Sequence, residues 1–165
     1  PGASVLDVGC GQGTPVTNTL ALDFDVVGVD FSRAQLRLAR SNVPDARFVQ
    51  GDMTALPVES SSFDAVCAFY SLIHVPVAEH ERVISEFARV LRPGGYLLST
   101  VGAEAWKGSN PDWLDSGVEM QWSFPDIEAT YEILDRVGLD VVAECVVDDE
   151  LGSQYPCVLA RYDVN

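Results

Sequence analysis

Three carboxylates in the first third of the chain stand at positions where a ligand could meet them. Asp7 lies inside the apolar run 5–8, and Asp30 and Asp52 end or follow the next two apolar runs. The carboxyl ends of parallel strands share one crevice, where a carboxylate can accept hydrogen bonds from the hydroxyls of a ribose. An acid inside a buried strand is costly unless a donor or cation faces it. The predicted chemistry is binding of a ribose-containing ligand with a cationic centre.

Alternating glycines follow Asp7 directly, in the stretch Gly9-Cys10-Gly11-Gln12-Gly13. A buried parallel strand that ends in a glycine-rich turn has this composition. Glycine adopts positive φ without steric cost and lets a ligand lie against the backbone, while the free N–H groups of the next helix face that ligand. The spacing G-x-G-x-G differs from the G-x-G-x-x-G of pyrophosphate sites, and no basic residue is near. The turn therefore favours a cationic ligand over a phosphate.

Apolar runs and helical stripes alternate along the chain. We expect strands near residues 4–8, 25–30, 46–50, 63–70, 95–101, 139–147 and 154–162, and helices at 15–22, 32–42, 79–91 and 126–137. Such alternation predicts a parallel sheet with helices on both faces. Only the short link 148–153 joins the last two strands, so they should form an antiparallel hairpin. The predicted fold is α/β, a doubly wound, mostly parallel seven-stranded sheet with an antiparallel C-terminal hairpin.

Local signals mark the ends of two of these helices. Ser32 and Gln35 form a capping box at the start of the second helix. In the third, apolar residues recur at helical spacing, and Pro93-Gly94-Gly95 is expected to end it. His80 stands among charged residues at the start of this helix, which predicts a solvated side chain.

Five segments together resemble the class I S-adenosylmethionine-dependent methyltransferases. They are Val5–Gly13, Val26–Asp30, Gly51-Asp52-Met53, the strand 63–70 with Ser71–Pro76 after it, and Leu91–Gly95. In order and spacing they cover residues 4 to 101. The resemblance implies a Rossmann-like fold and an enzyme that transfers a methyl group from S-adenosyl-L-methionine by in-line displacement, with S-adenosyl-L-homocysteine as product.

The resemblance also implies where the methionine end of the cofactor lies. The turn of Gly9, Cys10, Gly11 and Gly13 would hold this end, and the backbone of Phe69 would lie near its amino group. Cys10 occupies a place where the family often has cysteine, so we assign it no redox role.

For the nucleoside end, the resemblance implies that Asp30 holds the ribose. Asp52 and the backbone of Met53 would meet the adenine edge, with Phe31 packing on its face. Asp7 is assigned to the cofactor site as well, because a carboxylate near the end of a buried strand needs a partner.

Two residues after the fourth strand are candidates for the catalytic step. In-line displacement needs no covalent enzyme intermediate, so alignment of the reacting atoms supplies most of the catalysis. A base matters only if the acceptor must lose a proton, and the ordinary pKa of His74 suits that task. Alternatively, His74 fixes the loop through a backbone hydrogen bond. Tyr70 either contacts cofactor or acceptor, or is a buried ring whose hydroxyl has a partner.

Residues 102–124 interrupt the alternation and show no clear periodicity. They contain all three tryptophans of the chain, Trp106, Trp113 and Trp122. A loop of this length is often a binding loop or lid, and it leaves the carboxyl end of a strand on the cofactor side. We expect the aromatic rings to wall the acceptor pocket. The alternative is that they anchor the loop to the core.

Composition predicts a single domain over residues 1–165. Hydrophobic residues make up 47% of the 165 residues, no apolar run is long enough for a membrane span, and no signal peptide opens the chain. Because residue 1 falls just before the first strand, we expect an N-terminal lid segment to be missing. Four cysteines without C-x-x-C spacing predict no metal site. Because no secretory signal is present, we expect a cytoplasmic location, where disulfides do not form.

The charge balance is strongly acidic. Twenty-five acids and ten bases give a net charge of −15. Such self-repulsion is screened at high salt, so the composition resembles that of halophilic proteins. The alternative is an ordinary acidic enzyme from a mesophile. Nucleic acid is not an expected partner, because phosphate contacts need clustered cations. A small-molecule acceptor is expected instead.

Three alternatives remain open. A nicotinamide-dependent oxidoreductase shares the strand–glycine–helix–acid arrangement, but it predicts the G-x-G-x-x-G spacing. A binding-only relative of the methyltransferases would bind S-adenosylmethionine and transfer nothing. Aminopropyl transfer from a decarboxylated cofactor is a further variant.

Overall fold

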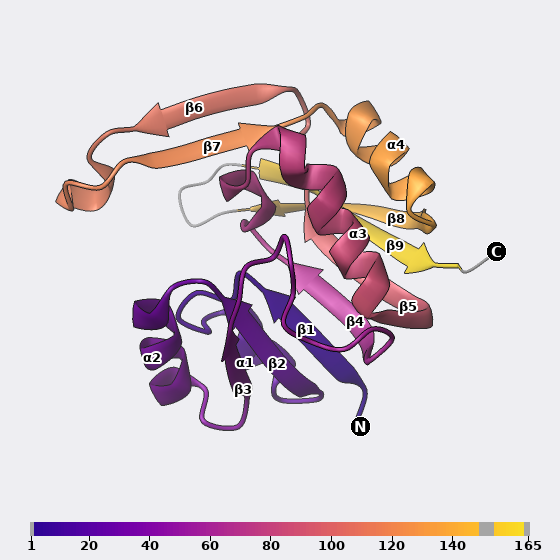
Figure 1. Cartoon of the computed structure of the whole chain (residues 1–165), viewed down its shortest axis with the longest axis horizontal. Helices are drawn as coiled ribbons and strands as arrows, with labels where there is room; N and C mark the ends of the chain where they lie inside the picture. Colours follow the sequence, from indigo (N-terminus) through magenta and orange to yellow (C-terminus); the bar gives the residue numbers. More distant parts are fainter. Residues whose placement is uncertain (1, 149–153, 164–165) are drawn as a thin grey trace.

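A seven-stranded sheet of order β3-β2-β1-β4-β5-β9-β8 forms the centre of the molecule (Figure 1). The computed structural model describes residues 2–148 and 154–163. The strands are β1 (Ser4–Val8), β2 (Asp25–Asp30), β3 (Arg47–Gln50), β4 (Phe63–Ala68), β5 (Leu91–Thr100), β8 (Leu139–Asp148) and β9 (Gln154–Tyr162). β1 to β5 pair in parallel, and β9 runs antiparallel to β5 and β8. The predicted sheet and its antiparallel C-terminal hairpin are confirmed; the link residues 149–153 lie outside the described residues.

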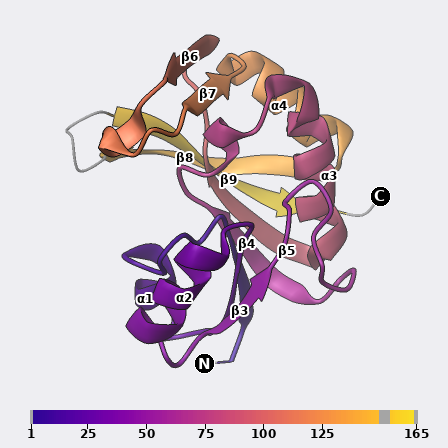
Figure 2. The same ribbon diagram turned by 60° about the vertical axis from the view of Figure 1, so that its left-hand side comes forward.

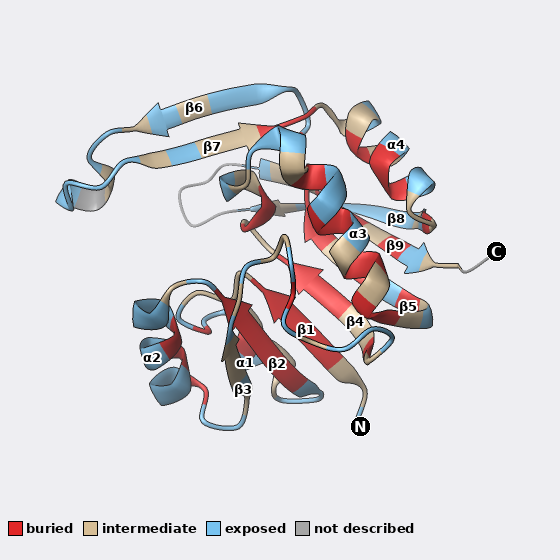
Figure 3. Cartoon of the chain, in the orientation of Figure 1, coloured by how far each residue is buried: buried red, intermediate tan, exposed pale blue. Residues whose placement is uncertain are grey.

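Helices cover both faces of this sheet. They are α1 (Val16–Leu20), α2 (Arg33–Asn42), α3 (His80–Val90) and α4 (Ile127–Arg136). Figures 1 and 2 show α3 and α4 side by side on one face, with α1 on the other. Alternate side chains of β1 divide accordingly: Leu6 joins the larger core cluster with Phe87 of α3, whereas Val5 packs in a smaller cluster with Leu20 of α1. Buried residues run along the central strands and the inward side of α3 (Figure 3).

The parallel register brings the predicted site residues to one edge. Val8 pairs with Val29 and Asp30 pairs with Gln50. The residues that follow β1, β2 and β3 therefore leave the sheet at the same level. β4 ends at Ala68, two residues earlier than expected, because Tyr70 already has a positive φ of 51°.

The end of the third helix differs from the prediction. α3 ends at Val90, and Leu91 is already extended, with ψ of 139°. Pro93-Gly94-Gly95, expected to stop the helix, lies within β5. The pairing of β4 with β5 shifts its register between Phe63 and Ala65. Since proline cannot donate to a sheet, the irregular pairing accommodates it there.

The sequence predicted an irregular loop over residues 102–124, and the structure differs from this prediction. β6 (Trp106–Asn110) and β7 (Met120–Phe124) pair antiparallel as a separate two-stranded sheet, with a 3-10 turn η3 (Trp113–Asp115) between them. The indole of Trp106 lies over Gly108, where a Cβ would come within 2.6 Å of the ring. This hairpin, β6–β7, projects along one end of the molecule and is largely exposed or half-buried (Figure 3).

Membrane insertion through a helix has no support in the described ranges 2–148 and 154–163, since none of their helices combines the length and apolarity needed to cross a bilayer.

Candidate functional site

The glycine-rich turn after β1 is held tightly against two neighbouring segments. Gly9, Gly11 and Gly13 all have positive φ, at 74°, 53° and 84°. The N–H of Gly9 donates to the carbonyl of Val29 on β2 at 2.8 Å. On the other side, a Cβ at Gly9 would come within 2.3 Å of the Cβ of Ser71. Glycine is therefore required at position 9 both for its conformation and for this close approach.

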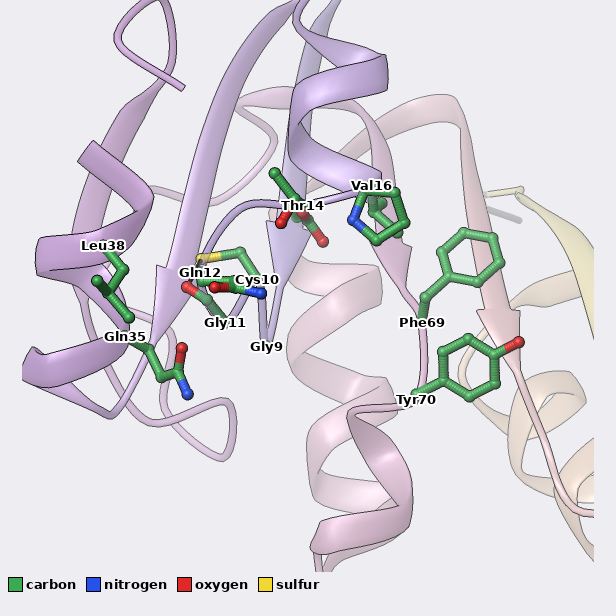
Figure 4. Close-up of a pocket in the computed structure, with 12 residues that line it drawn as sticks. Gly9, Cys10, Gly11, Gln12, Thr14, Val16, Gln35, Leu38, Phe69 and Tyr70 are labelled. Atoms are coloured by element: carbon green, nitrogen blue, oxygen red, sulfur yellow. Dashed lines mark hydrogen bonds between the residues drawn. The ribbon is translucent and has the colours of Figure 1, made fainter. Parts of the chain in front are cut away.

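A cavity of about 450 Å³ opens beside this turn. Figure 4 shows Phe69 and Tyr70 on one side of it and Gln35 and Leu38 of α2 on the other, with the turn between them. The cavity lies beyond the carboxyl ends of β1 and β4, where ligands bind in open parallel sheets. The structure thus brings Gly9, Cys10, Gly11 and Phe69 together around one space, whereas Gly13 lies against Val43 and Ala39 and does not line it.

Asp7 also lines this cavity, and it is only 2% exposed. Thr17 Oγ1 of α1 donates to Asp7 Oδ2 at 2.5 Å. Burial raises the pKa of Asp7 to about 6, the Thr17 hydrogen bond opposes this rise, and the negative charge of Asp30 adds to it. In the described part of the chain no cationic side chain pairs with Asp7, so the site favours a positively charged ligand.

Asp30 is fixed by the turn and by the start of α2. Its Oδ2 accepts from the N–H of Gly11 at 2.9 Å, and its Oδ1 accepts from the N–H of Ser32 at 2.8 Å. An ionised carboxylate has about four acceptor positions. The remaining positions can accept hydrogen bonds from ribose hydroxyls, as the sequence predicts.

The residues assigned to adenine lie beyond β2 and β3. Asp52 Oδ1 accepts from both the N–H and the Oγ1 of Thr54, each at 2.8 Å, and these bonds lower the pKa of Asp52. Phe31 is 76% exposed, while its carbonyl accepts from Gln50 Nε2 at 2.9 Å. An exposed ring on a fixed backbone is available to a flat ligand. Met53 is half-buried and packs against the larger core cluster.

Cys10 packs inward from the turn. A Cβ at Gly28 would come within 2.8 Å of the Cys10 sulfur, so the glycine in β2 makes room for this thiol. Burial raises the pKa of Cys10, and the charges of Asp7 and Asp30 raise it further. The thiol stays protonated and is a poor nucleophile.

Tyr70 links the cavity to the C-terminal strands. Its ring meets Tyr155 of β9 edge-on, with centroids 5.3 Å apart, and Tyr155 lies 6.5 Å from Phe124 of β7. The N–H of Tyr70 donates to Thr100 Oγ1 at 2.8 Å. Aromatic rings therefore lead from the cavity towards the hairpin β6–β7.

His74 belongs to the 3-10 turn η1 (Leu72–His74), against which β7 packs. Its ring lies 6.4 Å from that of Trp122 and makes a hydrogen bond with the backbone of Gln121. Burial against the hairpin lowers the pKa of His74, so the imidazole is neutral near pH 7 and can accept a proton. The same contacts also suit the alternative role of fixing the loop.

The other two tryptophans, Trp106 and Trp113, both lie next to Trp122. Its ring is 5.0 Å from Trp113 and 6.4 Å from Trp106. Trp106 is 52% exposed, while Trp113 and Trp122 are half-buried. The structure therefore unites Trp106, Trp113, Trp122 and His74 in one aromatic cluster.

His80 was predicted to be solvated, and that prediction is wrong. The side chain is 1% exposed, and its Nε2 lies 3.0 Å from the carbonyl oxygen of Val75. The same oxygen accepts from Ser123 Oγ of β7 at 3.1 Å. A 3-10 turn η2 (Val77–Glu79) before α3 directs His80 inward, although its neighbours in the sequence are charged. His80 thus connects α3, the chain after η1 and the hairpin β6–β7.

Comparison with known proteins agrees with this geometry. Residues 5–95 match the model of the methyltransferase domain family. A demethylmenaquinone methyltransferase from Renibacterium salmoninarum is 41% identical over 98 residues, which are 59% of this chain and 40% of that protein. Methyltransferase GfsG from Streptomyces halstedii is 32% identical over 176 residues, covering 99% of this chain and 62% of that protein. The chain thus spans 40% to 62% of the length of these relatives.

A solved structure gives the same fold over nearly the whole chain. The S-adenosylmethionine-dependent methyltransferase from Methanosarcina mazei superposes with a TM-score of 0.84 at 20% identity, over 99% of this chain and 93% of that one. At this identity the likeness concerns the fold alone. The chain therefore belongs to the methyltransferase domain family, and its fold is the Rossmann-like fold of that structure.

Proposed function

We propose that this chain binds S-adenosyl-L-methionine beside the glycine turn and transfers its methyl group to a small-molecule acceptor. The observation that carries this proposal is Asp7, which lines the cavity, is 2% exposed and, among the residues that the structure describes, pairs with no cationic side chain; burial raises its pKa. A cationic ligand stabilises such a carboxylate, whereas a pyrophosphate repels it. This favours a sulfonium cofactor over a nicotinamide dinucleotide.

The residues present fit this cofactor. Residues 9–12 of the turn and Phe69 border the space for its methionine end, and Asp30 keeps acceptor positions for its ribose. Asp52, Met53 and Phe31 lie at the neighbouring strand ends, where the adenine is expected. When bound, S-adenosylmethionine supplies an electrophilic methyl group; the chain contributes orientation and exclusion of water.

For the acceptor, we propose that the aromatic cluster forms one wall of its pocket. Trp122 lies against His74, and Trp106 and Trp113 lie against Trp122; His74 follows β4 beyond Tyr70, which lines the cavity. Flat or apolar acceptors suit such a wall. The relative from Renibacterium salmoninarum is named for a small molecule, demethylmenaquinone. If the acceptor must lose a proton, His74 is the base within this cluster.

Calorimetry tests the cofactor first. The protein is titrated with S-adenosylmethionine and with NAD in buffer with molar potassium chloride, and Asp30→Ala serves as the control. Binding of S-adenosylmethionine that weakens in the variant, without NAD binding, supports the proposal; no binding of S-adenosylmethionine overturns it. A panel of acceptors then follows release of S-adenosylhomocysteine. Binding without release from any acceptor favours the non-catalytic alternative.

A further inference from the structure

The turn that follows β3 is attached to the rest of the protein at both of its ends. Within it, the N–H of Ala55 donates to the carbonyl of Asp52 at 3.1 Å. Just before it, the N–H of Gly51 donates to the carbonyl of Asp30 on β2, also at 3.1 Å. Just after it, Leu56 is buried in the larger core cluster. The position of the Asp52 carboxylate therefore depends on what holds Gly51 and Leu56.

Two side chains of α3 hold the backbone of Leu56. Glu86 Oε2 accepts from its N–H at 2.7 Å, and Arg89 Nη2 donates to its carbonyl at 3.1 Å. Arg89 Nη1 also donates to the carbonyl of Val58 and to Ser60 Oγ, each at 3.1 Å. The Nε of Arg89 donates to Glu86 Oε1 at 2.7 Å. Every nitrogen of this guanidinium thus has a partner, and most of the partners lie in the segment after β3.

A second ion pair of α3 shows how unusual this arrangement is. Arg136 of α4 pairs with Glu81 of α3 at 3.0 Å, and 49% and 56% of these two side chains is exposed. For Arg89 and Glu86 the exposed fractions are 33% and 19%. Exposed ion pairs contribute little to stability, whereas an arginine with several charge-assisted and backbone contacts fixes a geometry. The Glu86–Arg89 pair therefore acts on the position of the segment that it binds.

A cavity of about 490 Å³ lies beside these contacts. It is lined by residues 54–56 and Val58 of the segment after β3 and by Ser85, Glu86 and Arg89 of α3. Because side chains do not fill this space, packing alone does not hold the turn at its distance from α3. The hydrogen bonds of Glu86 and Arg89 set that distance.

We propose that Arg89, together with Glu86, positions the Asp52 turn to recognise the amine of adenine. This assignment rests on the cofactor binding proposed above, in which Asp52 meets the adenine edge. Asp52 Oδ1 already accepts two hydrogen bonds from Thr54, which leaves Oδ2 as the acceptor for an amine. Such a bond weakens steeply when its geometry is poor, so a displaced turn loses it. Arg89 acts through the backbone of Leu56 and is therefore a positioning residue.

Calorimetry with two ligands measures recognition of the amine. S-adenosylhomocysteine carries this amine, and S-inosylhomocysteine carries an oxygen in its place. The parent should prefer S-adenosylhomocysteine by about tenfold or more, the effect of one hydrogen bond to a charged group. Asp52→Asn should lose the preference, because its amide is neutral and can turn its NH₂ group towards the oxygen.

Arg89→Met keeps the length of the side chain and removes its donors. We expect Arg89→Met to bind S-adenosylhomocysteine about tenfold more weakly than the parent and S-inosylhomocysteine within about twofold of it. Arg89→Lys is the milder variant. Its ammonium can still pair with Glu86, but one nitrogen cannot also reach the two backbone carbonyls, so the preference should fall again.

Arg136→Gln is the matched control, since it removes the other arginine pair of α3 without touching the segment after β3. It should keep the preference of the parent. Thermal unfolding of all variants separates the two kinds of effect. A merely structural role of Arg89 lowers the melting temperature or the fraction of protein that binds, and it leaves the ratio of the two affinities unchanged.

The outcomes separate the positioning role from the proposed function. A preference equal to that of the parent in both Arg89 variants overturns the positioning role, and so does an equal loss of affinity for both ligands. If Asp52→Asn keeps the preference, the amine is recognised elsewhere and the role of Arg89 fails with that of Asp52. In these cases the parent still binds S-adenosylhomocysteine. If it binds neither ligand, the proposed function itself fails.

Discussion

Replacing Asp7 with Asn should stabilise the free protein while weakening cofactor binding. Burial raises the pKa of Asp7 from 3.8 to about 6. A shift of about two pKa units at about 1.4 kcal/mol each means that ionised Asp7 costs the folded state about 3 kcal/mol above pH 7. Asn carries no charge, and its Oδ1 can still accept the hydrogen bond from Thr17 Oγ1. The gain from Asp7→Asn should therefore approach 3 kcal/mol at pH 8.

The pH dependence of this gain follows from the sign of the shift. An acid with a raised pKa in the folded state keeps its proton longer there than in the unfolded chain. The parent therefore loses stability as pH rises from about 4 through 6, while the variant lacks this loss. Near and below pH 4, Asp7 is largely protonated in both the folded and the unfolded chain. The difference in stability between the parent and Asp7→Asn should therefore fall under about 1 kcal/mol.

Denaturant titrations of parent and Asp7→Asn at pH 4, 6 and 8 measure this difference directly. Asp64→Asn is the matched control. Asp64 pairs with Arg92 at 2.6 Å, and this lowers the pKa of Asp64. The stability that Asp64 contributes to the folded protein should therefore be lost as pH falls, the opposite of the behaviour of Asp7. Calorimetry should show weaker binding of S-adenosylmethionine to Asp7→Asn, since the cation loses its carboxylate. The reasoning is refuted if Asp7→Asn is no more stable than the parent at pH 8. It is also refuted if the gain in stability is the same at pH 4 and at pH 8.

Three further predictions concern the hairpin β6–β7 and the charge of the chain. His80→Leu removes the donor to the Val75 carbonyl, whereas His80→Gln keeps one. All three tryptophans lie at 106–122, so tryptophan emission reports on the hairpin. The Leu variant should shift this emission to the red with helix content preserved, and the Gln variant should not. Equal emission from both would show that the hydrogen bond does not hold the hairpin. Trp122→Ala should raise the Michaelis constant for the acceptor severalfold and leave S-adenosylmethionine affinity unchanged; an unchanged Michaelis constant would leave only the anchoring role. With a net charge of −15, the midpoint of denaturation by urea should rise between millimolar and molar potassium chloride, and equal midpoints would remove the halophile hypothesis.

The sheet and the cofactor crevice could be predicted because local patterns determine them. Apolar runs alternate with helical stripes, and Gly9 to Gly13 follow the first run at a fixed spacing. In a parallel sheet these signals also imply a shared edge, so Asp30 and the turn could be placed together before any contact was known. The observed Asp30–Gly11 hydrogen bond of 2.9 Å agrees with that placement.

Features that arise from distant contacts could not be predicted. The strand Trp106–Asn110 contains lysine, glycine, serine and asparagine, which give no alternating apolar pattern. It forms because Trp106 lies over Gly108 and because β7 pairs with it. His80 is buried by segments from η1 onward, and Ser71 by its approach to Gly9, which is far away in the sequence. The pattern of neighbouring residues in the sequence does not predict such burial.

The outer strand β8 affects how the protein behaves when concentrated. In the part of the chain that the structure describes, β9 is the one strand paired with β8, so its other edge is open to a strand from another molecule. Asp140 and Glu144 place negative charge along this edge, and Val142 and Val146 are 53% and 63% exposed. At high protein concentration, association between two molecules is therefore expected to begin along β8.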